Sequence, residues 1–596
     1  MRRVLMATAG ALALASCAQQ PASKATETKA ETTVETATAT AVSTPITPLA
    51  PLPTTSFPAF RDAFVEQLFQ LDPTYAVYQG RHDFDGQLPN WSPAGLKQMA
   101  DFLKEAIADA GKFDDAKLPA DQAFERRYLV KVAEGRLFWL TDADQPHKNP
   151  YYYINDGLDP NAFIARPYAD KATRLKAITK FFGNIPTAAA QIRANLQAPL
   201  PLSLINYGVA AFKGYGDFYA GDARKAFADV KDAKLQADFV KASDAAAKAM
   251  HDLAYWVEQQ RPHATRDFVL GKDRFARMLL ATEGVDTPLD QLEQIGRADL
   301  KRNRDALVAA CAKFAPGASV PACIAKLNAN KPVGGPVAEA RRQIPMLRAF
   351  VTSHDIVSIP GTEQAMVEES PPYNRQNFAY IDPPGPFDKG IPSVYYISPP
   401  DPTWSKAVQD AYVPGKADLL FTTVHEVMPG HFVQFLHANR SPSKFGQIFV
   451  GYAFAEGWAH YAEEMMWDAG LNNGDPETHI GQLSNALLRD CRFLSAIGLH
   501  TGGMSVTQSE QLFRTECFQD EGTAKQQAAR GTYDPAYLNY TMGKLMIRRL
   551  RADWTKDKGG RKAWKAFHDA FLSYGGPPIP LVRQAMLKEA DAKAVF

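Results

Sequence analysis

The amino-acid sequence predicts a mainly α-helical protein that carries one small β-sheet. Apolar residues recur at three- and four-residue spacing through long stretches rich in Ala, Leu, Lys, Glu and Gln, which is the periodicity of amphipathic helices. Strands and helices do not alternate at the spacing of an α/β fold, and the sequence shows neither a long internal repeat nor a glycine-rich phosphate-binding motif. The predicted helices include 94–111, 119–140, 171–198, 235–260, 287–314 and 558–573.

The predicted sheet lies in the segment 377–398. Asn377-Phe378-Ala379-Tyr380 and Ser393-Val394-Tyr395-Tyr396-Ile397 contain aromatic and β-branched residues and flank a stretch rich in Pro and Gly. This pattern predicts two short strands. Because the segment precedes a histidine motif, described below, we expect the sheet to lie beside the helices of that motif.

Composition and charge exclude several classes of protein. The chain has 596 residues, of which 66 are basic and 65 acidic, so its net charge is only +1. A nucleic-acid-binding protein needs a clear basic excess on one face, and no block of Lys and Arg stands out here. A polytopic membrane protein needs runs of about 18 apolar residues, which the sequence lacks. Hydrophobic residues make up 46% of the chain, which excludes disorder for most of it.

The first residues have the layout of a secretory signal peptide. Arg2 and Arg3 precede a short apolar stretch from Val4 to Ala15. The end of the stretch, Leu14-Ala15-Ser16-Cys17, resembles the bacterial lipoprotein cleavage box, in which the cysteine is lipidated and becomes the first mature residue. An ordinary signal peptide with an incidental cysteine is the alternative. No inner-membrane retention Asp follows Cys17, so the resemblance implies an outer-membrane lipoprotein that faces the periplasm.

The sequence therefore divides into three parts. Residues 1–16 are the predicted lipoprotein signal peptide, and 17–56 comprise lipidated Cys17 and a disordered tether. Residues 18–56 contain no aromatic side chain and are dominated by Thr, Ala, Glu, Ser and Pro, which cannot bury enough apolar area to fold. Residues 57–596 form the predicted helical domain. The mature chain is almost neutral, so we expect lipid alone to hold it at the membrane.

Export places the remaining cysteines in an oxidising compartment. The pairings that are local in sequence are Cys311 with Cys323 and Cys491 with Cys517. Free buried thiols are the alternative.

The residues best suited to catalysis follow the predicted sheet. His425 and His431 stand six residues apart, and Glu426 directly follows the first of them. Two histidines and a carboxylate are the ligands of a catalytic zinc, with a fourth position left for water. In a regular helix this spacing separates the two histidines by about 120° around the axis. We expect Pro429 to widen or kink the helix and so return His431 to the metal.

A third ligand is predicted on the next helix. Within 451–464, Glu456, His460 and Glu463 share one helical face, and Glu456 follows His431 by 25 residues, enough for an antiparallel helix to return. The pattern predicts one zinc ion per chain, bound by His425, His431 and Glu456. The alternative for the histidines is two ordinary side chains. For His460 and Glu463 we favour a supporting or surface role over direct ligation.

These residues resemble the bacterial family catalogued as domain of unknown function 885, and the likeness covers most of the mature chain. It is carried by 415–434, by Glu456-Gly457-Trp458-Ala459 and by an opening with Asp72-Pro73 and Trp91-Ser92-Pro93. Arg492, Gly498-Leu499-His500 and Tyr540 match later elements of the family. The resemblance implies a gluzincin-type zinc metallopeptidase. This chain departs from the family pattern at Phe432, Ala496 and Thr541, where the family commonly has His, Asp and Lys.

The zinc hypothesis assigns a role to each candidate residue. Glu426 is the predicted general base, which takes a proton from water and passes it to the leaving amine. By resemblance, Tyr540 or His500 donates to the oxygen that becomes negative. Arg492 or Lys544 is the candidate to bind a peptide carboxylate, although for Lys544 we favour the alternative of a charge on a solvated helix face. The strand at Tyr395 and Tyr396 is a candidate for pairing with an extended peptide, with core aromatics as the alternative.

The function predicted from the sequence is therefore zinc-dependent cleavage of small peptides in the cell envelope. The expected partners are a peptide substrate and, through lipid only, the membrane. Two alternatives remain open at this point. One is a lipoprotein that binds peptides or a metal without catalysis, and the other is a zinc hydrolase of a non-peptide amide or ester.

Overall fold

The computed structural model describes residues 45–371, 375, 378–589 and 595–596. The signal peptide, Cys17 and most of the predicted tether lie outside the described residues. Residues 45–56 contain no helix or strand, and the first helix begins at Phe57, where the sequence predicts the folded domain to begin. The Ser56 side chain caps this helix by accepting a hydrogen bond from the Ala59 N–H.

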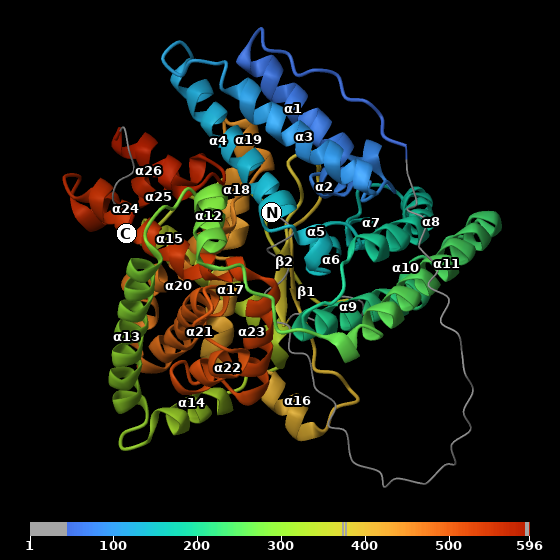
Figure 1. Ribbon diagram of the computed structural model, residues 1–596. Helices are drawn as coiled ribbons and strands as arrows, with labels where there is room; N and C mark the ends of the chain where they lie inside the picture. The colour runs from blue at the N-terminus through green and yellow to red at the C-terminus, as the bar shows by residue number, and fades with distance from the viewer. Residues whose placement is uncertain (1–44, 372–374, 376–377, 590–594) are drawn as a thin grey trace, which may run out of the picture.

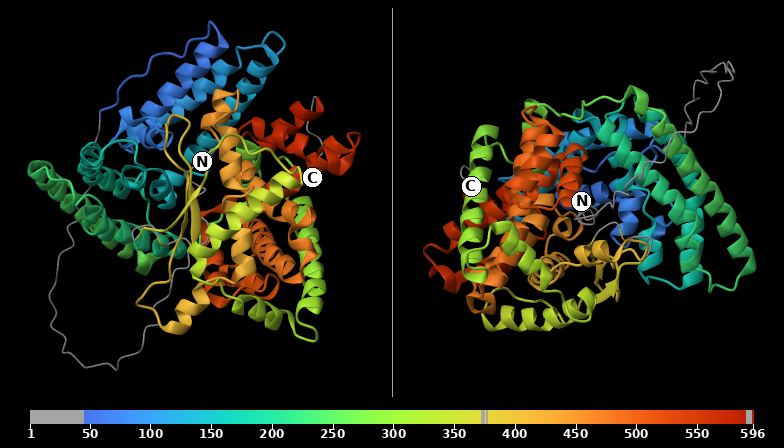
Figure 2. Two further views of the ribbon diagram at one scale, coloured as in Figure 1. Left: turned by 180° about the vertical axis from the view of Figure 1, so that it is seen from behind. Right: turned by 90° about the horizontal axis from the view of Figure 1, so that it is seen from below.

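The described part of the chain is mainly α-helical, as predicted, and its helices pack around two apolar cores. The N-terminal core joins the helices up to Glu258 with Phe445, Ile448 and Phe449, and the C-terminal core joins the later helices with the sheet. No helix in the described residues combines the length and hydropathy that crossing a membrane requires. Figures 1 and 2 show the strands between the two groups of helices.

The helices of the first group are α1 (Phe57–Leu71), α2 (Pro73–Tyr78), α3 (Pro93–Ala110), α4 (Ala120–Leu137), α5 (Gln145–Lys148), α6 (Tyr151–Asp156), α7 (Asn161–Ala165), α8 (Lys171–Asn195), α9 (Leu202–Ala220), α10 (Asp222–Ala226) and α11 (Ala233–Glu258). The helices between these and the sheet are α12 (Lys272–Glu283), α13 (Leu289–Phe314), α14 (Val320–Ala329) and α15 (Gly335–Ser353). The helices after the sheet are α16 (Lys406–Tyr412), α17 (Lys416–Glu426), α18 (His431–Ala438), α19 (Lys444–Ile448), α20 (Tyr452–Asp468), α21 (Pro476–His500), α22 (Val506–Thr515), α23 (Glu521–Tyr533), α24 (Asn539–Thr555), α25 (Trp564–Ser573) and α26 (Ile579–Leu587).

The sheet has three strands, β1 (Met366–Glu369), β2 (Ala379–Asp382) and β3 (Val394–Ile397), in the order β1-β3-β2. β2 pairs antiparallel with β3, as two adjacent strands suggest, whereas β1 pairs parallel with β3 and was not predicted. β3 is therefore the central strand, with neighbours on both sides. The predicted pairing of a substrate with the strand at Tyr395 and Tyr396 is wrong for that reason.

Two disulfide bonds form between the cysteines that are close in sequence. Cys311 at the end of α13 is bonded to Cys323 in α14, and Cys491 in α21 is bonded to Cys517 just after α22. Both disulfides therefore join consecutive helical segments of the C-terminal core.

Two glycines set the distance between α20 and α24. A Cβ atom on Gly543 would lie 2.1 Å from the Ala453 carbonyl oxygen and 2.7 Å from Gly457 Cα, and one on Gly457 would lie 2.5 Å from Gly543 Cα. These are backbone atoms, so no side chain could move aside to make room. The absence of both Cβ atoms allows the helix backbones to touch.

We predict that Gly543→Ala separates α20 from α24 and lowers the free energy of unfolding by about 1–3 kcal/mol, the usual cost of overpacking. Gly214→Ala, on exposed α9 with no atom within 4 Å of the new Cβ, is the control. It is expected to be neutral or to stabilise by up to about 1 kcal/mol through helix propensity. Thermal unfolding of the two variants checks the prediction, and equal melting temperatures would contradict it.

Candidate metal centre

The two histidines of the motif lie on consecutive helices. α17 ends at Glu426, directly after His425, and α18 begins at His431. The sequence predicted one kinked or widened helix, and this is wrong, because Pro429 lacks the N–H needed to continue the helix and the chain makes a turn instead. Gly430 packs so closely in this turn that a Cβ atom would lie 1.8 Å from the His425 carbonyl oxygen. The turn places the two imidazole rings 4.8 Å apart and nearly perpendicular.

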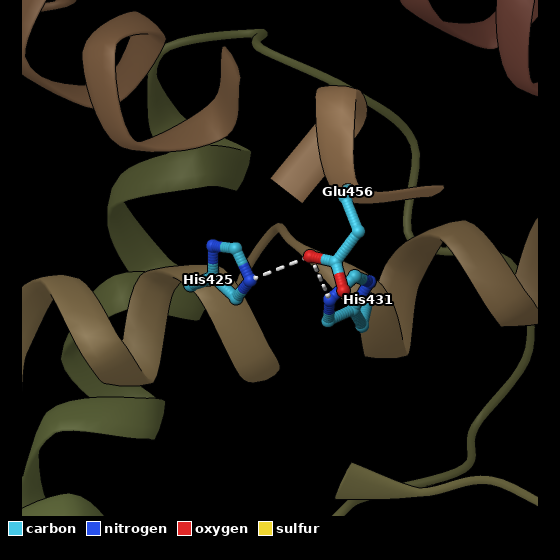
Figure 3. A group of neighbouring side chains, drawn as sticks. All are labelled: His425, His431 and Glu456. Carbon is cyan, nitrogen blue, oxygen red and sulfur yellow. Dashed lines mark hydrogen bonds and ion pairs between the residues drawn. The ribbon is translucent and has the colours of Figure 1, made fainter. Parts of the chain in front are cut away.

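Glu456 of α20 completes the group, as the sequence predicted. Its Oε2 lies 3.2 Å from His425 Nε2 and 3.4 Å from His431 Nε2 (Figure 3). All three donor atoms lie within 4.8 Å of one another, and the three residues are at most 2% exposed. Ligands of a tetrahedral zinc are about 3.4 Å apart when each bond is about 2.1 Å. The residues present therefore fit three ligands of a zinc ion.

A second group of side chains orients this set. Glu463 Oε1 lies 2.6 Å from His425 Nδ1 and 3.3 Å from Arg489, and Glu463 Oε2 lies 3.3 Å from His460 Nδ1. A carboxylate on Nδ1 fixes the imidazole tautomer that leaves Nε2 free for a metal. The supporting role predicted for Glu463 is consistent with these contacts. Arg489 was not predicted, because nothing local in the sequence ties it to His425.

The pKa values show how the site distributes charge. Burial acts to lower the pKa of His425, but its hydrogen bonds to Glu456 and Glu463 raise it to about 9. Burial acts to raise the pKa of Glu456, but the two histidines lower it far below the ordinary value. Burial lowers the pKa of His431, so the group combines an ionised Glu456 with an imidazole that favours its neutral form, and both are suited to bind a metal cation.

Glu426 is buried beside the metal group without belonging to it. Its carboxylate accepts a hydrogen bond from the Ile381 N–H of β2, the strand that packs on α17. Burial, with a contribution from nearby Glu456, raises the pKa of Glu426 to about 8. A carboxylate with a pKa near neutrality is suited to accept and return a proton.

Tyr540, at the start of α24, contacts a metal ligand directly. Its hydroxyl donates a 3.0 Å hydrogen bond to Glu456 Oε1, the oxygen that does not face the histidines. Because this O–H is already donated, the structure favours a role in orienting Glu456 over the predicted donation to substrate.

His500 does not join the site. Its Nε2 lies 2.6 Å from the Gly531 carbonyl oxygen, and its Nδ1 accepts a 3.4 Å hydrogen bond from the Leu270 N–H. Burial lowers its pKa to about 4. The predicted role as a catalytic donor is therefore wrong, since both ring nitrogens hold backbone segments together.

The two candidate carboxylate-binding cations differ in their partners. Lys544 is fully buried and lies 2.5 Å from Asp299, 3.7 Å from Glu464 and 4.0 Å from Asp490, so it is neither solvated nor available to a ligand. Arg492 is 1% exposed and donates to Gln527 at 2.7 Å, with its guanidinium 4.8 Å from the Tyr540 ring centre. No carboxylate in the described part of the chain forms an ion pair with Arg492.

The two tyrosines of β3 have different surroundings. Tyr395 is fully buried, and its hydroxyl lies near Thr423 and Glu426. Tyr396 packs against Tyr380 of β2, with ring centres 5.1 Å apart. The alternative that they are core aromatics fits Tyr395 best.

The sequence matches one protein family over most of its length. The family described as bacterial protein of unknown function, DUF885, matches residues 73–586. The chain belongs to this family. A comparison of the chain with curated proteins found no match.

Two solved structures share the fold of this chain. A candidate lipoprotein of unknown function from Shewanella oneidensis is 27% identical, with a TM-score of 0.74 over 89% of this chain and 100% of that one. A candidate lipoprotein from Colwellia psychrerythraea is 17% identical, with a TM-score of 0.72 over 88% of this chain and 97% of that one. The Trypanosoma cruzi metallocarboxypeptidase 1 aligns over 89% of this chain and 97% of its own, with 12% identity and a TM-score of only 0.35.

We predict that the purified protein binds one zinc ion per chain and that His431→Ala loses it, because two ligands are too few to hold the ion. His437→Ala is the control on the same helix, since the His437 Nε2 contacts the Ser358 carbonyl oxygen and not the metal group. Elemental analysis of both variants checks the prediction. Undiminished zinc in His431→Ala would refute the ligand assignment.

Proposed function

We propose that the protein is a zinc-dependent hydrolase that cleaves peptide bonds of small peptides in the cell envelope. The observation that carries the proposal is the buried group of His425, His431 and Glu456, whose donor atoms have the separations that zinc requires. A bound zinc ion supplies Lewis acidity, which polarises a carbonyl group and makes water more acidic. Glu426 lies next to this group and is not needed to hold the ion.

Residues of the chain transfer the proton and position the metal ligands. Glu426 takes the proton from the attacking water and then transfers it to the nitrogen of the leaving amine, so that no net proton is gained or lost by the enzyme. Tyr540 and Glu463 are positioning residues, because they act on substrate only through Glu456 and His425.

The charges near the site favour a substrate with a carboxylate. Three buried arginines surround Tyr540, with guanidinium groups 4.8–6.0 Å from its ring centre. Arg489 is paired with Glu463 and Arg530 with Asp534. Arg492 alone has no acidic partner in the described residues, so a peptide carboxylate would neutralise a buried cation there.

The decisive experiment compares wild type with Glu426→Gln on a peptide library. The variant should retain its zinc and its fold, because the amide has nearly the same size and the residue is not a ligand. Turnover should fall by roughly two to four orders of magnitude, the usual contribution of a positioned base. Glu293→Gln, whose side chain is 43% exposed on α13, is the control and should not change turnover.

The outcomes separate the alternatives. Full activity in Glu426→Gln would exclude this residue as the base. A wild type that binds peptides and cleaves none would indicate a binding protein, and cleavage of esters or non-peptide amides alone would indicate the other hydrolase. The library contains each peptide as the free acid and as the amide, and equal cleavage of the two forms would refute the role of Arg492.

We further propose that lipid on Cys17 anchors the protein in the cell envelope, in the outer membrane and facing the periplasm. The support is the cleavage box at Leu14-Ala15-Ser16-Cys17 and the fold shared with candidate lipoproteins. Cys17→Ala should abolish acylation and release the protein from membrane fractions. Acyl chains detected by mass spectrometry on the altered protein would contradict the proposal.

A further inference from the structure

A cavity of about 210 Å³ lies beside the metal centre, where α20 begins. Tyr452, the first residue of α20, lines the cavity, and the metal ligand Glu456 follows one helical turn later. The Tyr452 ring centre is 5.8 Å from that of Tyr540, whose hydroxyl binds Glu456. Aromatic side chains form about a third of the wall, among them Tyr75, Trp91, Trp139, Tyr151, Tyr452 and Tyr533.

Charged side chains in the wall are paired, with one exception. Asp72 lies 3.0 Å from Arg136, which also lines the cavity, and Asp534 lies 2.8 Å from Arg530. Glu283, the last residue of α12, is the exception, because no cation in the described residues forms an ion pair with it. The cavity therefore offers one unneutralised acidic group among aromatic rings.

Only one oxygen of Glu283 has a structural role. Oε1 accepts hydrogen bonds from the Asn539 side chain at 2.9 Å and from the Ala453 N–H at 3.4 Å. Oε2 is buried and has no hydrogen-bond partner in the described residues. The whole residue is only 1% exposed, so solvent does not supply a partner either. Burial raises the pKa of Glu283 to about 8. A buried polar atom without a partner is costly, and a donor in the cavity would remove that cost.

We propose that this cavity binds an ammonium group on an apolar stem, with the nitrogen at the Glu283 carboxyl group, which lines the cavity, and the carbon atoms against the aromatic rings. A carboxylate surrounded by aromatic faces favours a cation through both the ion pair and the ring quadrupoles. A neutral apolar group would leave Oε2 unpartnered, and an anion would form no ion pair with Glu283. Because Tyr452 of the cavity wall lies one helical turn from the metal ligand Glu456, the natural carrier is the α-amine or a lysine side chain of a peptide, and this part rests on the proposed function.

The first test uses two small probes of the same shape. 2-Phenylethylamine carries the ammonium group, and 2-phenylethanol replaces it with a neutral hydroxyl. Calorimetric titration of the zinc-loaded protein should give at least roughly tenfold tighter binding of the amine, as expected for a charge-assisted hydrogen bond in a buried site. Equal affinity for the two probes would overturn the proposal.

Glu283→Gln is the matched variant. Its amide oxygen can still accept from Ala453 and Asn539, so the contact to α20 is kept, while Oε2 is replaced by an NH₂ group that repels a cation. The preference for the amine should disappear, whereas Glu293→Gln should keep it. A melting temperature near that of wild type verifies the fold. A preference that survives in a folded Glu283→Gln protein would refute Glu283 as the binding group.

The second test distinguishes the two carriers and is independent of catalysis. Peptides with a free or acetylated amino end, and with Lys or norleucine, are titrated into Glu426→Gln protein, which should not cleave them. Acetylation of the amino end or replacement of Lys by norleucine should weaken binding to Glu426→Gln protein. The modification that does so, but has no effect when Glu283→Gln is also present, identifies the source of the ammonium group. If neither change matters while the small amine still binds, the peptide part of the inference is wrong. Absence of cleavage by wild type would refute the proposed function alone.

Discussion

The metal centre depends on the contact between the backbones of α20 and α24. Gly457 and Gly543 have no Cβ atoms, and their contact lies one residue beyond Glu456 on one helix and three residues beyond Tyr540 on the other. At this separation the Tyr540 hydroxyl reaches Glu456 Oε1, which leaves Oε2 directed at His425 and His431. A small increase in the distance between the helices would therefore misplace a ligand without altering any ligand residue.

Burial then makes each charged group of the site depend on a partner. Glu456 is stabilised as a carboxylate by the two histidines, and Glu463 is stabilised by Arg489 as well as by His425 and His460. These partners come from α17, α18, α20 and α21, so the electrostatic stability of the centre requires the C-terminal helices to be assembled. Helix α19, which lies between α18 and α20 in the chain, is in addition held by the N-terminal helices, because the Tyr75 hydroxyl donates to the Ile448 carbonyl oxygen at 2.9 Å. Both groups of helices thus contribute to positioning the ligands.

Features that depend on residues close in sequence could be predicted, whereas features that depend on distant segments of the chain could not. Helical periodicity is local, and the mainly helical fold was predicted correctly. His425, His431 and Glu456 were predicted to converge because their residue types and spacing suit one metal, although the local path at Pro429 was not. β1 was missed because it pairs in parallel with β3, and β2 lies between these two strands in the sequence. Glu283 was missed for the same reason, since its partners lie more than 150 residues away.

A buried arginine and a buried carboxyl group lie near the metal centre, and neither has an ionic partner in the described residues. Arg492 packs on Tyr540, and Glu283 supports the first turn of α20 next to Tyr452. Leaving a cation and a carboxyl group buried without counter-charges opposes folding, so the protein retains both at a cost to its stability. A neutral ester or amide would recover none of that cost on binding, whereas a short peptide carries both an ammonium group and a carboxylate. The two buried groups therefore support the proposed peptide substrate over uncharged ones, and they do so independently of the metal ligands.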